Sequence, residues 1–274
     1  MSWTAYKIVL RLQTPMHIGQ AKLGNLQITR PYVHGKALWG ALTARITRDT
    51  PVYSNDYQAL GRRVNEELAF SYFYATTGDD VELWPWEDPE RFAWHFLGSY
   101  ASTALNYSQN SAAEGSLHET EFVAPETRDG KPVNLVGAIF EREGCTLPWQ
   151  EALAKLQVGG ERTYGWGRVR VQAITNLQAG EKLLGLHPLD LGGERPVVDL
   201  SVDALLLAHA LAYGEHAIQA GGRLVPLVGR ETRAANAHGR SVTHAAICWE
   251  PGSRVRAATK VCIGENGIWE AVSP

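Results

Sequence analysis

The sequence predicts an α+β fold in which a ferredoxin-like βαββαβ domain, residues 1–175, precedes a smaller α+β domain, residues 176–274. Two observations predict the first domain. Its apolar residues change between a spacing of two and a spacing of three to four from one segment to the next, and a glycine-rich segment stands before its last strand pattern. For the second domain, a degenerate copy of the same ferredoxin-like unit is an open alternative.

The first element is a strand. Residues 6–13 (YKIVLRLQ) place Ile8, Leu10 and Leu12 on one side, and the Thr-Pro pair that follows ends the alternation. We then expect a polar, glycine-containing loop over residues 17–35.

Helical patterns come next. Apolar residues recur every three to four positions from Lys36 and again after Asn55, which predicts two helices. We expect the aromatic run at residues 71–74 to close the second helix. The acidic, aromatic stretch at residues 79–90 is expected to be a loop that forms a protein contact or a solvent-exposed surface.

The second half of the unit contains the remaining elements. Two extended runs within residues 117–140 flank Asp129-Gly130, a strong turn signal that predicts a hairpin. Residues 148–157 (PWQEALAKLQ) predict a short helix with proline near its first turn. A final strand is expected over residues 168–174, after the glycine-rich segment.

The C-terminal part is less regular. Residues 176–195 are rich in glycine and leucine without a clean period, which favours a boundary there. We expect a helix over residues 202–213 and extended runs over residues 223–230 and 242–249.

Charge is distributed unevenly along the chain. Residues 1–48 contain seven of the 26 basic residues and none of the 29 acidic ones, so this segment carries +7 and the remainder −10. A strongly positive region in a mildly acidic protein is typical of a partner with a phosphate backbone. A basic surface without a partner is the alternative.

Other classes are disfavoured by composition. The three cysteines, Cys145, Cys248 and Cys262, form no Cys-x-x-Cys pair, so neither a disulfide framework nor a zinc site is indicated. The N-terminus has no signal-peptide pattern, and no apolar stretch is long enough to span a membrane. We expect a cytoplasmic protein without a membrane contact, a metal or a cofactor.

A first candidate anion site lies at the start of the first helix. If Gly35 begins that helix, its free amides, with Arg30 and Lys36 nearby, would suit a backbone phosphate. The alternative is that Gly35 only supplies an unusual backbone angle and that Trp39 and Leu42 are core residues.

The second candidate is the glycine-rich segment, residues 158–168 (VGGERTYGWGR). No Gly-Lys-Ser/Thr follows it, and it comes after a helix, so it is neither a P-loop nor a dinucleotide fingerprint. Glycine lets another backbone approach closely, which would let amides face phosphates, while Tyr164 and Trp166 would stack on unpaired bases. A tight connection with both rings in the core is the alternative.

Three motifs in this order resemble the RAMP superfamily of CRISPR-associated proteins. They are a P-x-H-I-G-like turn at residues 15–19, an R-P-Y-V-x-G-like helix entry at residues 30–35, and the glycine-rich loop at residues 159–167. The resemblance covers residues 5–173. The C-terminal segment, from residue 222 to residue 255, also looks like the end of subunits that cap the guide RNA (crRNA) in type III effector complexes.

The resemblance implies a non-catalytic subunit of a type III CRISPR antiviral effector complex that holds the repeat-derived 5′ end of the crRNA. Its partners would be the crRNA, indirectly the target RNA, and neighbouring subunits. The expected RNA-binding residues come from the three motifs, the first helix and the C-terminal segment: His17, Gly19, Lys22, Arg30, His34, Gly35, Lys36, Arg45, Gly159, Gly160, Arg162, Tyr164, Gly165, Trp166, Gly167, Arg168, Arg230 and Arg233.

Two alternatives stay open. One is a metal-independent endoribonuclease that processes precursor crRNA with His17 or His34 as general base. The other is a backbone or 3′-end subunit of the same complex. Some family members cut target RNA with an Asp in the loop after the first strand, but residues 17–35 contain no Asp, so no catalytic residue is assigned.

Overall fold

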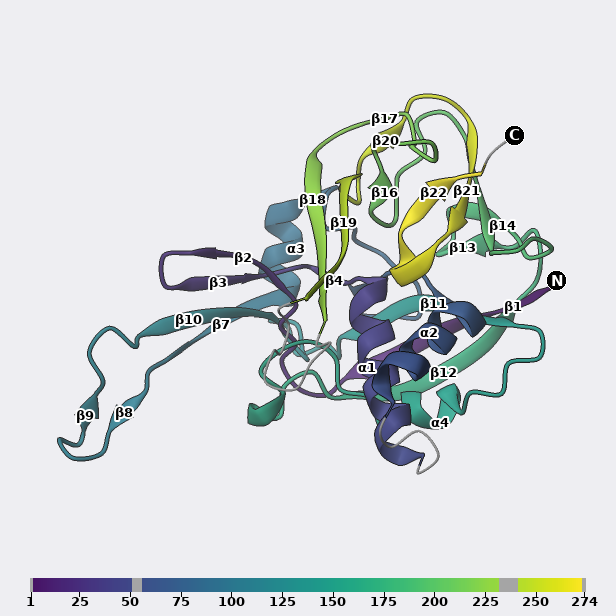
Figure 1. Cartoon of the computed structure of the whole chain (residues 1–274). Coiled ribbons are helices and arrows are strands. Elements are labelled where there is room, and N and C mark those ends of the chain that lie inside the picture. The colour runs from purple at the N-terminus through teal and green to yellow at the C-terminus, as the bar shows by residue number, and fades with distance from the viewer. Residues whose placement is uncertain (1, 51–55, 232–240, 273–274) are drawn as a thin grey trace.

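The computed structural model describes residues 2–50, 56–231 and 241–272. Its central sheet contains strands from both halves of the first domain (Figure 1). Their spatial order is β12-β1-β11-β6-β4, β5 also pairs with β11, and all these pairs are antiparallel. The strands are β1 (Trp3–Leu12), β4 (Tyr32–Val33), β5 (Leu68–Phe70), β6 (Phe73–Thr76), β11 (Asn134–Arg142) and β12 (Val169–Leu177).

Helices cover one face of this sheet. They are α1 (Gly35–Asp49), α2 (Tyr57–Glu67) and the short α4 (Trp149–Leu153). Ile8, Leu10 and Leu12 of β1 share one buried core with these helices, so the predicted alternation of β1 and both predicted long helices are confirmed. The helix predicted at residues 148–157 is present but shorter.

A second sheet projects from the body (Figure 1). Its order is β2-β3-β10-β7, and the small β8–β9 hairpin extends it outward. Its elements are β2 (Gly19–Leu23), β3 (Leu26–Thr29), β7 (Leu97–Ser102), β8 (Leu105–Asn106), β9 (Ser111–Ala112) and β10 (His118–Val123), and α3 (Pro89–Phe96) precedes β7. The loop expected at residues 17–35 is therefore wrong, because most of it forms strands.

Two further expectations for the first domain are corrected, and a third is confirmed in part. Residues 71–74 do not close α2, since they lie between and within the buried strands β5 and β6. The turn at Asp129-Gly130 exists, but β10 and β11 pair with different sheets and form no hairpin with each other. Residues 79–88 form the expected loop, and most of them are exposed or partly exposed, but Trp84 is buried and stacks on Trp86.

The C-terminal part is built from strands. Its largest sheet has the order β13-β14-β15-β21-β22-β16-β19-β18, and β17 pairs with β20. The strands are β13 (Lys182–Leu183), β14 (His187–Asp190), β15 (Val197–Leu200), β16 (Ala210–Leu211), β17 (Ala220–Gly221), β18 (Leu224–Glu231), β19 (Ser241–Trp249), β20 (Arg254–Val255), β21 (Thr259–Ile263) and β22 (Trp269–Ala271).

The extended runs expected at residues 223–230 and 242–249 are confirmed as β18 and β19. The helix expected over residues 202–213 is wrong, because this segment forms turns and the short strand β16. Among the described residues after β12, only a 3-10 turn, Glu265–Gly267, is helical, so the α+β assignment of this part is also wrong. The helix was expected because residues 204–208 form a buried apolar run, and such a run can have the same composition in a helix and in an irregular core segment.

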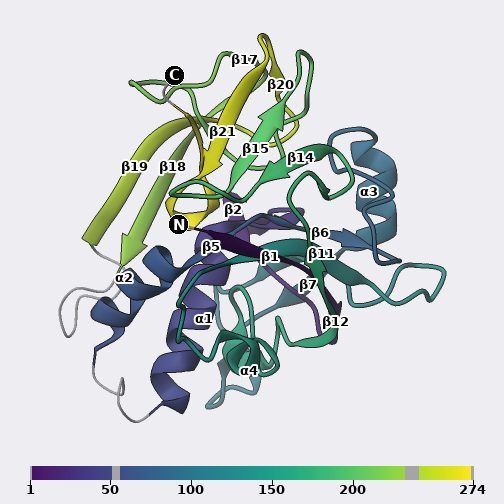
Figure 2. The same cartoon turned by 90° about the vertical axis from the view of Figure 1, so that its right-hand side faces the viewer.

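The two parts share a core. Trp3, Tyr74 and Phe140 on the second face of the central sheet pack with Leu206 and Trp269 of the C-terminal part. Figure 2 shows the C-terminal strands above the central sheet, opposite α1 and α4. Because β12 continues to Leu177, the boundary expected after residue 175 falls inside a strand.

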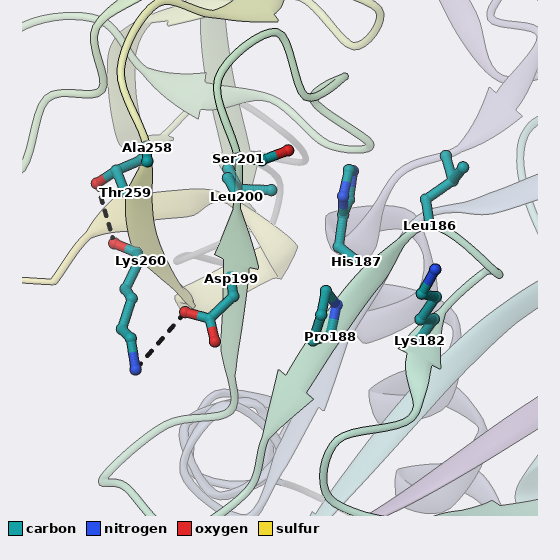
Figure 3. A pocket seen from close by; sticks show the side chains of 10 residues that line it. All are labelled: Lys182, Leu186, His187, Pro188, Asp199, Leu200, Ser201, Ala258, Thr259 and Lys260. Atoms are coloured by element: carbon teal, nitrogen blue, oxygen red, sulfur yellow. Dashed lines mark hydrogen bonds and ion pairs between the residues drawn. The ribbon is translucent and has the colours of Figure 1, made fainter.

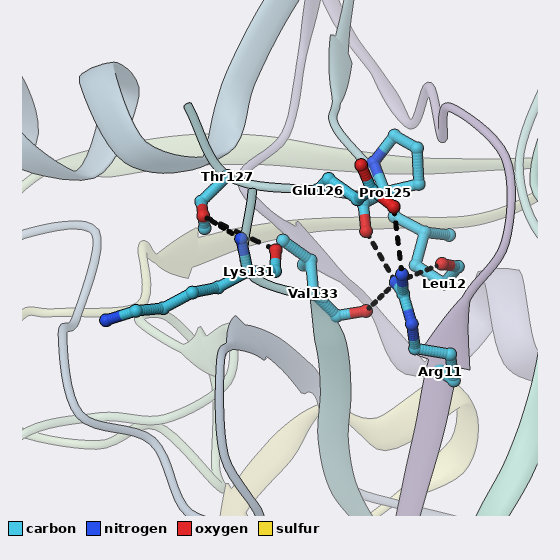
Figure 4. A network of polar contacts seen from close by, with 7 residues as sticks. All are labelled: Arg11, Leu12, Pro125, Glu126, Thr127, Lys131 and Val133. Carbon is cyan, nitrogen blue, oxygen red and sulfur yellow. Dashed lines mark hydrogen bonds and ion pairs between the residues drawn. The ribbon is translucent and has the colours of Figure 1, made fainter. Parts of the chain in front are cut away.

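Part of the N-terminal positive charge is used inside the fold. Arg11 donates to the carbonyl oxygens of Leu12, Pro125 and Val133 and so joins β1 to the turn before β11 (Figure 4). Lys7 forms an ion pair with Asp80 (Nζ–Oδ1, 2.6 Å). These two cations therefore stabilise the fold and are not free to bind a partner. No helix within the described residues is both long and apolar enough to cross a membrane.

Candidate nucleic-acid interface

The glycine-rich loop packs directly on the turn that ends β1. Gly160 donates its backbone N–H to the His17 carbonyl (2.9 Å), and Gly167 donates to the Pro15 carbonyl (2.7 Å). The Thr14 hydroxyl donates to the carbonyl of Gly165 (2.9 Å). The approaching backbone is therefore the protein's own, and the amides of Gly160 and Gly167 are not free for phosphates. This corrects the expected role of these two glycines.

A basic cleft lies between α1 and the glycine-rich loop. Arg45 and Arg48 of α1, Lys155 after α4 and Arg162 of the loop line a cavity of about 270 Å³. Arg48 and Arg162 are exposed. Four cations from three separate segments converge here, which suits a polyanion.

One acidic residue partly balances this cleft. Asp49 forms ion pairs with Arg45 (Nε–Oδ2, 2.9 Å) and Lys155 (Nζ–Oδ2, 3.3 Å). The hydrogen bond from Arg45, followed by that from Lys155, lowers the pKa of Asp49 below its usual range. Asp49 is thus ionised at neutral pH and holds both cations toward the cleft.

An aromatic groove lies on another side of the same loop. Tyr164 and Trp166 of the loop, with Tyr100 of β7 and Phe122 of β10, line a groove of about 530 Å³. Tyr164 is 79% exposed, whereas Trp166 is half-buried and meets Phe122 edge to face (centroids 5.2 Å apart). Tyr164 is therefore not a core residue, and its ring face is open to a ligand.

A third cleft lies at the start of α1. Gly19, Arg30, His34 and Lys36 line it together with residues 226–229 of β18, and its volume is about 290 Å³. Four predicted site residues are thus brought together. Burial, followed by the nearby charges of Arg30 and Lys36, lowers the pKa of His34 to about 3, so its imidazole is neutral at pH 7. Its Nδ1 accepts the N–H of Ala37 (3.3 Å) and caps α1.

Gly35 itself is covered by protein. A Cβ added there would overlap the backbone carbonyl of Asn266, in the 3-10 turn of the C-terminal part. The anion site expected on the amides at Gly35 is therefore wrong, since protein occupies that position. The cleft beside it keeps the expected cations.

The family model described as RAMPs: RAMP superfamily matches residues 9–170. The chain belongs to the RAMP superfamily. No curated protein matches the sequence. A chain of a type III-B Cmr-beta structure bound to cognate target RNA and AMPPnP has a TM-score of 0.49 and 11% identity, with 91% of this chain and 85% of that chain covered. A chain of the same complex bound to cognate target RNA has a TM-score of 0.41 and 11% identity, over 61% of this chain and 96% of the other. A chain of the apo Cmr-beta structure has a TM-score of 0.42 and 10% identity, over the same shares.

The remaining predicted residues of this RAMP protein are spread over several surfaces. His17 is buried, with Nδ1 at 2.7 Å from the Glu121 carbonyl, so it positions the loop and offers no exposed ring. Lys22 is exposed on β2 of the projecting sheet, and Arg168 is exposed beside the loop. Arg230 is exposed on β18, next to the cleft residue Gly229, and Arg233 lies outside the described residues.

The structure adds residues that the sequence did not indicate. Arg48 and Lys155 join the basic cleft, and Tyr100, Phe122 and Glu161 join the aromatic groove. Arg48 could have been found, because it follows Arg45 by three positions on one helix face. Lys155 and Tyr100 carry no local signal, since only the tertiary fold brings them to the loop.

A larger cleft of about 670 Å³ lies in the C-terminal part, apart from every predicted site residue (Figure 3). Lys182 and Lys260 stand at its rim, and Lys260 forms an ion pair with Asp199 (Nζ–Oδ1, 3.6 Å). His187 lines it, and its Nε2 donates to the Leu205 carbonyl oxygen (2.8 Å). Within the described residues, no group of three or more His, Cys, Asp or Glu side chains could hold a metal ion.

Proposed function

We propose that this RAMP protein is a non-catalytic RNA-binding subunit of a type III CRISPR effector complex that holds the repeat-derived 5′ end of the crRNA. The observation that carries the proposal is the glycine-rich loop, which presents Arg162 to a basic cleft and Tyr164 to an aromatic groove. Proteins bind single-stranded RNA by combining positively charged side chains, which contact phosphates, with exposed aromatic rings, on which bases stack. The loop provides both kinds of side chain.

The proposal includes a ferredoxin-like arrangement of the central sheet. The four strands of the βαββαβ unit are β1, β6, β11 and β12 in sequence order. In the sheet they lie in the order β12-β1-β11-β6, which is fourth, first, third and second, and neighbouring strands are antiparallel. This order supports the arrangement. It places the ends of β1 and β12 side by side, where the glycine-rich loop contacts the β1 turn.

The absence of catalysis is supported by the state of both candidate bases. With a pKa of about 3, His34 is a weak base at neutral pH, where an efficient general base has a pKa near the working pH. His17 is buried, and its Nδ1 is committed to a backbone carbonyl. We therefore expect labelled repeat RNA to stay intact when incubated with the purified chain, and specific cleavage would favour the endoribonuclease instead.

The decisive experiment is sequencing of the RNA that stays bound when the chain is purified from cells that make its guide RNAs. We expect one shared, repeat-derived 5′ end. RNA with random ends would exclude 5′-end capping. Crosslinks at regular intervals along the guide, or only at its 3′ end, would indicate a backbone or 3′-end subunit.

A further inference from the structure

The aromatic groove is lined by one carboxylate, Glu161, and by no Lys or Arg side chain. Glu161 lines the groove together with Tyr164 and Trp166 of the loop and directly precedes the exposed Arg162 in sequence. No described side chain forms an ion pair with it. A free carboxylate repels a phosphate backbone and accepts hydrogen bonds, so the ligand group that suits it is one that donates them.

Glu161 also adopts an unfavourable backbone conformation. Its φ is +54°, in the left-handed region that favours glycine. Its carbonyl accepts the N–H groups of Tyr164 (3.0 Å) and Trp166 (3.4 Å), so the same turn fixes the carboxylate and both rings relative to each other. Strained residues of this kind cluster at binding sites.

The groove offers flat apolar faces. Tyr100 is 60% exposed and Tyr164 is 79% exposed, while Phe122 lies across Gly98 of the neighbouring strand and contacts Trp166. The volume of about 530 Å³ falls within the range of about 300–1,000 Å³ that is usual for small-ligand sites. A single base stacked on one of these tyrosines would cover one face of the tyrosine ring and one face of the base.

Two of the polar side chains that line the groove, His118 and Ser102, are linked so that an acceptor is presented. His118 contacts the Ser116 carbonyl through Nδ1 (3.0 Å), so Nδ1 carries the proton and Nε2 accepts the Ser102 hydroxyl (2.9 Å). The Ser102 oxygen is then left with lone pairs only, like the Glu161 carboxylate. Guanine alone among the four bases presents two adjacent donors, N1–H and the 2-amino group, on one edge, which matches the two oxygens of a carboxylate.

We infer that this groove binds a single unpaired guanine of RNA, stacked on an exposed tyrosine and held by Glu161 through N1–H and the 2-amino group. The inference rests on the proposed function, because it assumes that the loop binds single-stranded RNA. It adds base selectivity to the phosphate binding that we propose for the cations of the basic cleft.

The test compares labelled oligouridylates that carry one central guanosine, inosine or adenosine, by fluorescence anisotropy with the purified full chain. Inosine keeps N1–H and lacks the 2-amino group. We expect guanosine RNA to bind about tenfold more tightly than inosine RNA, the size of one hydrogen bond to a charged group. In Glu161→Gly the preference disappears, while folding is kept because glycine adopts this φ without strain.

Two tyrosine variants separate stacking from hydrogen bonding. Tyr164→Ala should weaken all three RNAs by about tenfold, because stacking tolerates every base. Tyr213→Ala, an equally exposed ring in the C-terminal part, should leave all affinities unchanged. Equal affinity for guanosine and inosine RNA, or a preference that survives in Glu161→Gly, would overturn the guanine assignment while RNA binding stands. A chain that binds none of the RNAs would overturn the proposed function as well.

Discussion

Gly160 donates its backbone N–H to the carbonyl oxygen of His17 across 2.9 Å. The bond joins the glycine-rich loop to the turn at the end of β1, two segments that are far apart in sequence. With the bond from Gly167 to Pro15, it fixes the position of the loop relative to the central sheet. Arg162, Tyr164 and Trp166 are therefore presented by a rigid support.

The first prediction concerns this junction. Gly159 has a φ of +90°, and a Cβ added there would overlap the His17 carbonyl. Gly159→Ala should lower the free energy of unfolding by about 2–5 kcal/mol, from backbone strain together with overpacking. Gly165→Ala is the matched control: its φ is +84°, with nothing near the added atom, so it should cost only about 1–2 kcal/mol. Denaturant unfolding measures both, and equal losses would show that the junction is not tightly packed.

The second prediction concerns phosphate contacts. Arg162 and Arg168 are both exposed at the loop. Arg162→Ala with Arg168→Ala should weaken RNA binding and reduce the slope of log K against log salt by about 1.4, since each lost phosphate contact on a single strand removes about 0.7. Affinity is measured over a salt series. An unchanged slope would exclude the loop as a phosphate-binding surface, and Arg254→Ala with Arg256→Ala in the C-terminal part controls for the lost net charge.

Regular amphipathic elements could be predicted from the sequence because their pattern is local. The alternation in β1 and the helical spacing in α1 and α2 each report a buried face. Residues 71–74 and 204–210 were assigned wrongly, since both stretches are almost fully buried and lack the polar positions that distinguish a strand from a helix. The turn at Asp129-Gly130 was visible, but not the separation of β10 and β11 into two sheets, which depends on partners far away in sequence.

The residues of the candidate site could likewise be predicted only where the signal is local. Tyr164, Arg162 and Arg30 were found because they lie within motifs. The contact of the C-terminal part with Gly35 could not be predicted from the local sequence, because the contacting residue, Asn266, is at the other end of the chain. Net charge in residues 1–48 also overstated the positive charge that is available to a partner, since a count of residues does not show ion pairs such as Lys7–Asp80.

The third prediction concerns the contact between the two parts of the chain. A methyl group on Gly35 would overlap the Asn266 carbonyl, so Gly35→Ala should destabilise the protein by about 1–3 kcal/mol through overpacking. Gly40→Ala in the same helix meets only the Tyr57 hydroxyl at 3.8 Å and should be neutral or stabilising by up to about 1 kcal/mol. Thermal unfolding compares the two, and similar melting temperatures would contradict the close approach at Gly35.

The fourth prediction concerns a buried histidine between the two parts. His209 is fully buried, and its Nδ1 lies 2.8 Å from the Tyr72 hydroxyl. Burial, followed by the charge of Arg30, lowers its pKa to about 3. In the unfolded chain the pKa is about 6.5, so below that pH the unfolded state binds the extra proton and stability falls. Its contribution is fully present above pH 6.5 and is lost progressively as the pH falls toward 3.

Between pH 7.5 and pH 5.0 this linkage should remove about 2 kcal/mol of unfolding free energy through His209 alone. His209→Gln cannot titrate, so its stability should fall less steeply over the same range, although its stability at pH 7.5 is lower because the contact with Tyr72 is altered. Urea unfolding at several pH values measures the slope for both proteins. Parallel curves would mean that His209 is not held neutral in the fold, whereas curves that converge toward pH 5.0 are the expected result.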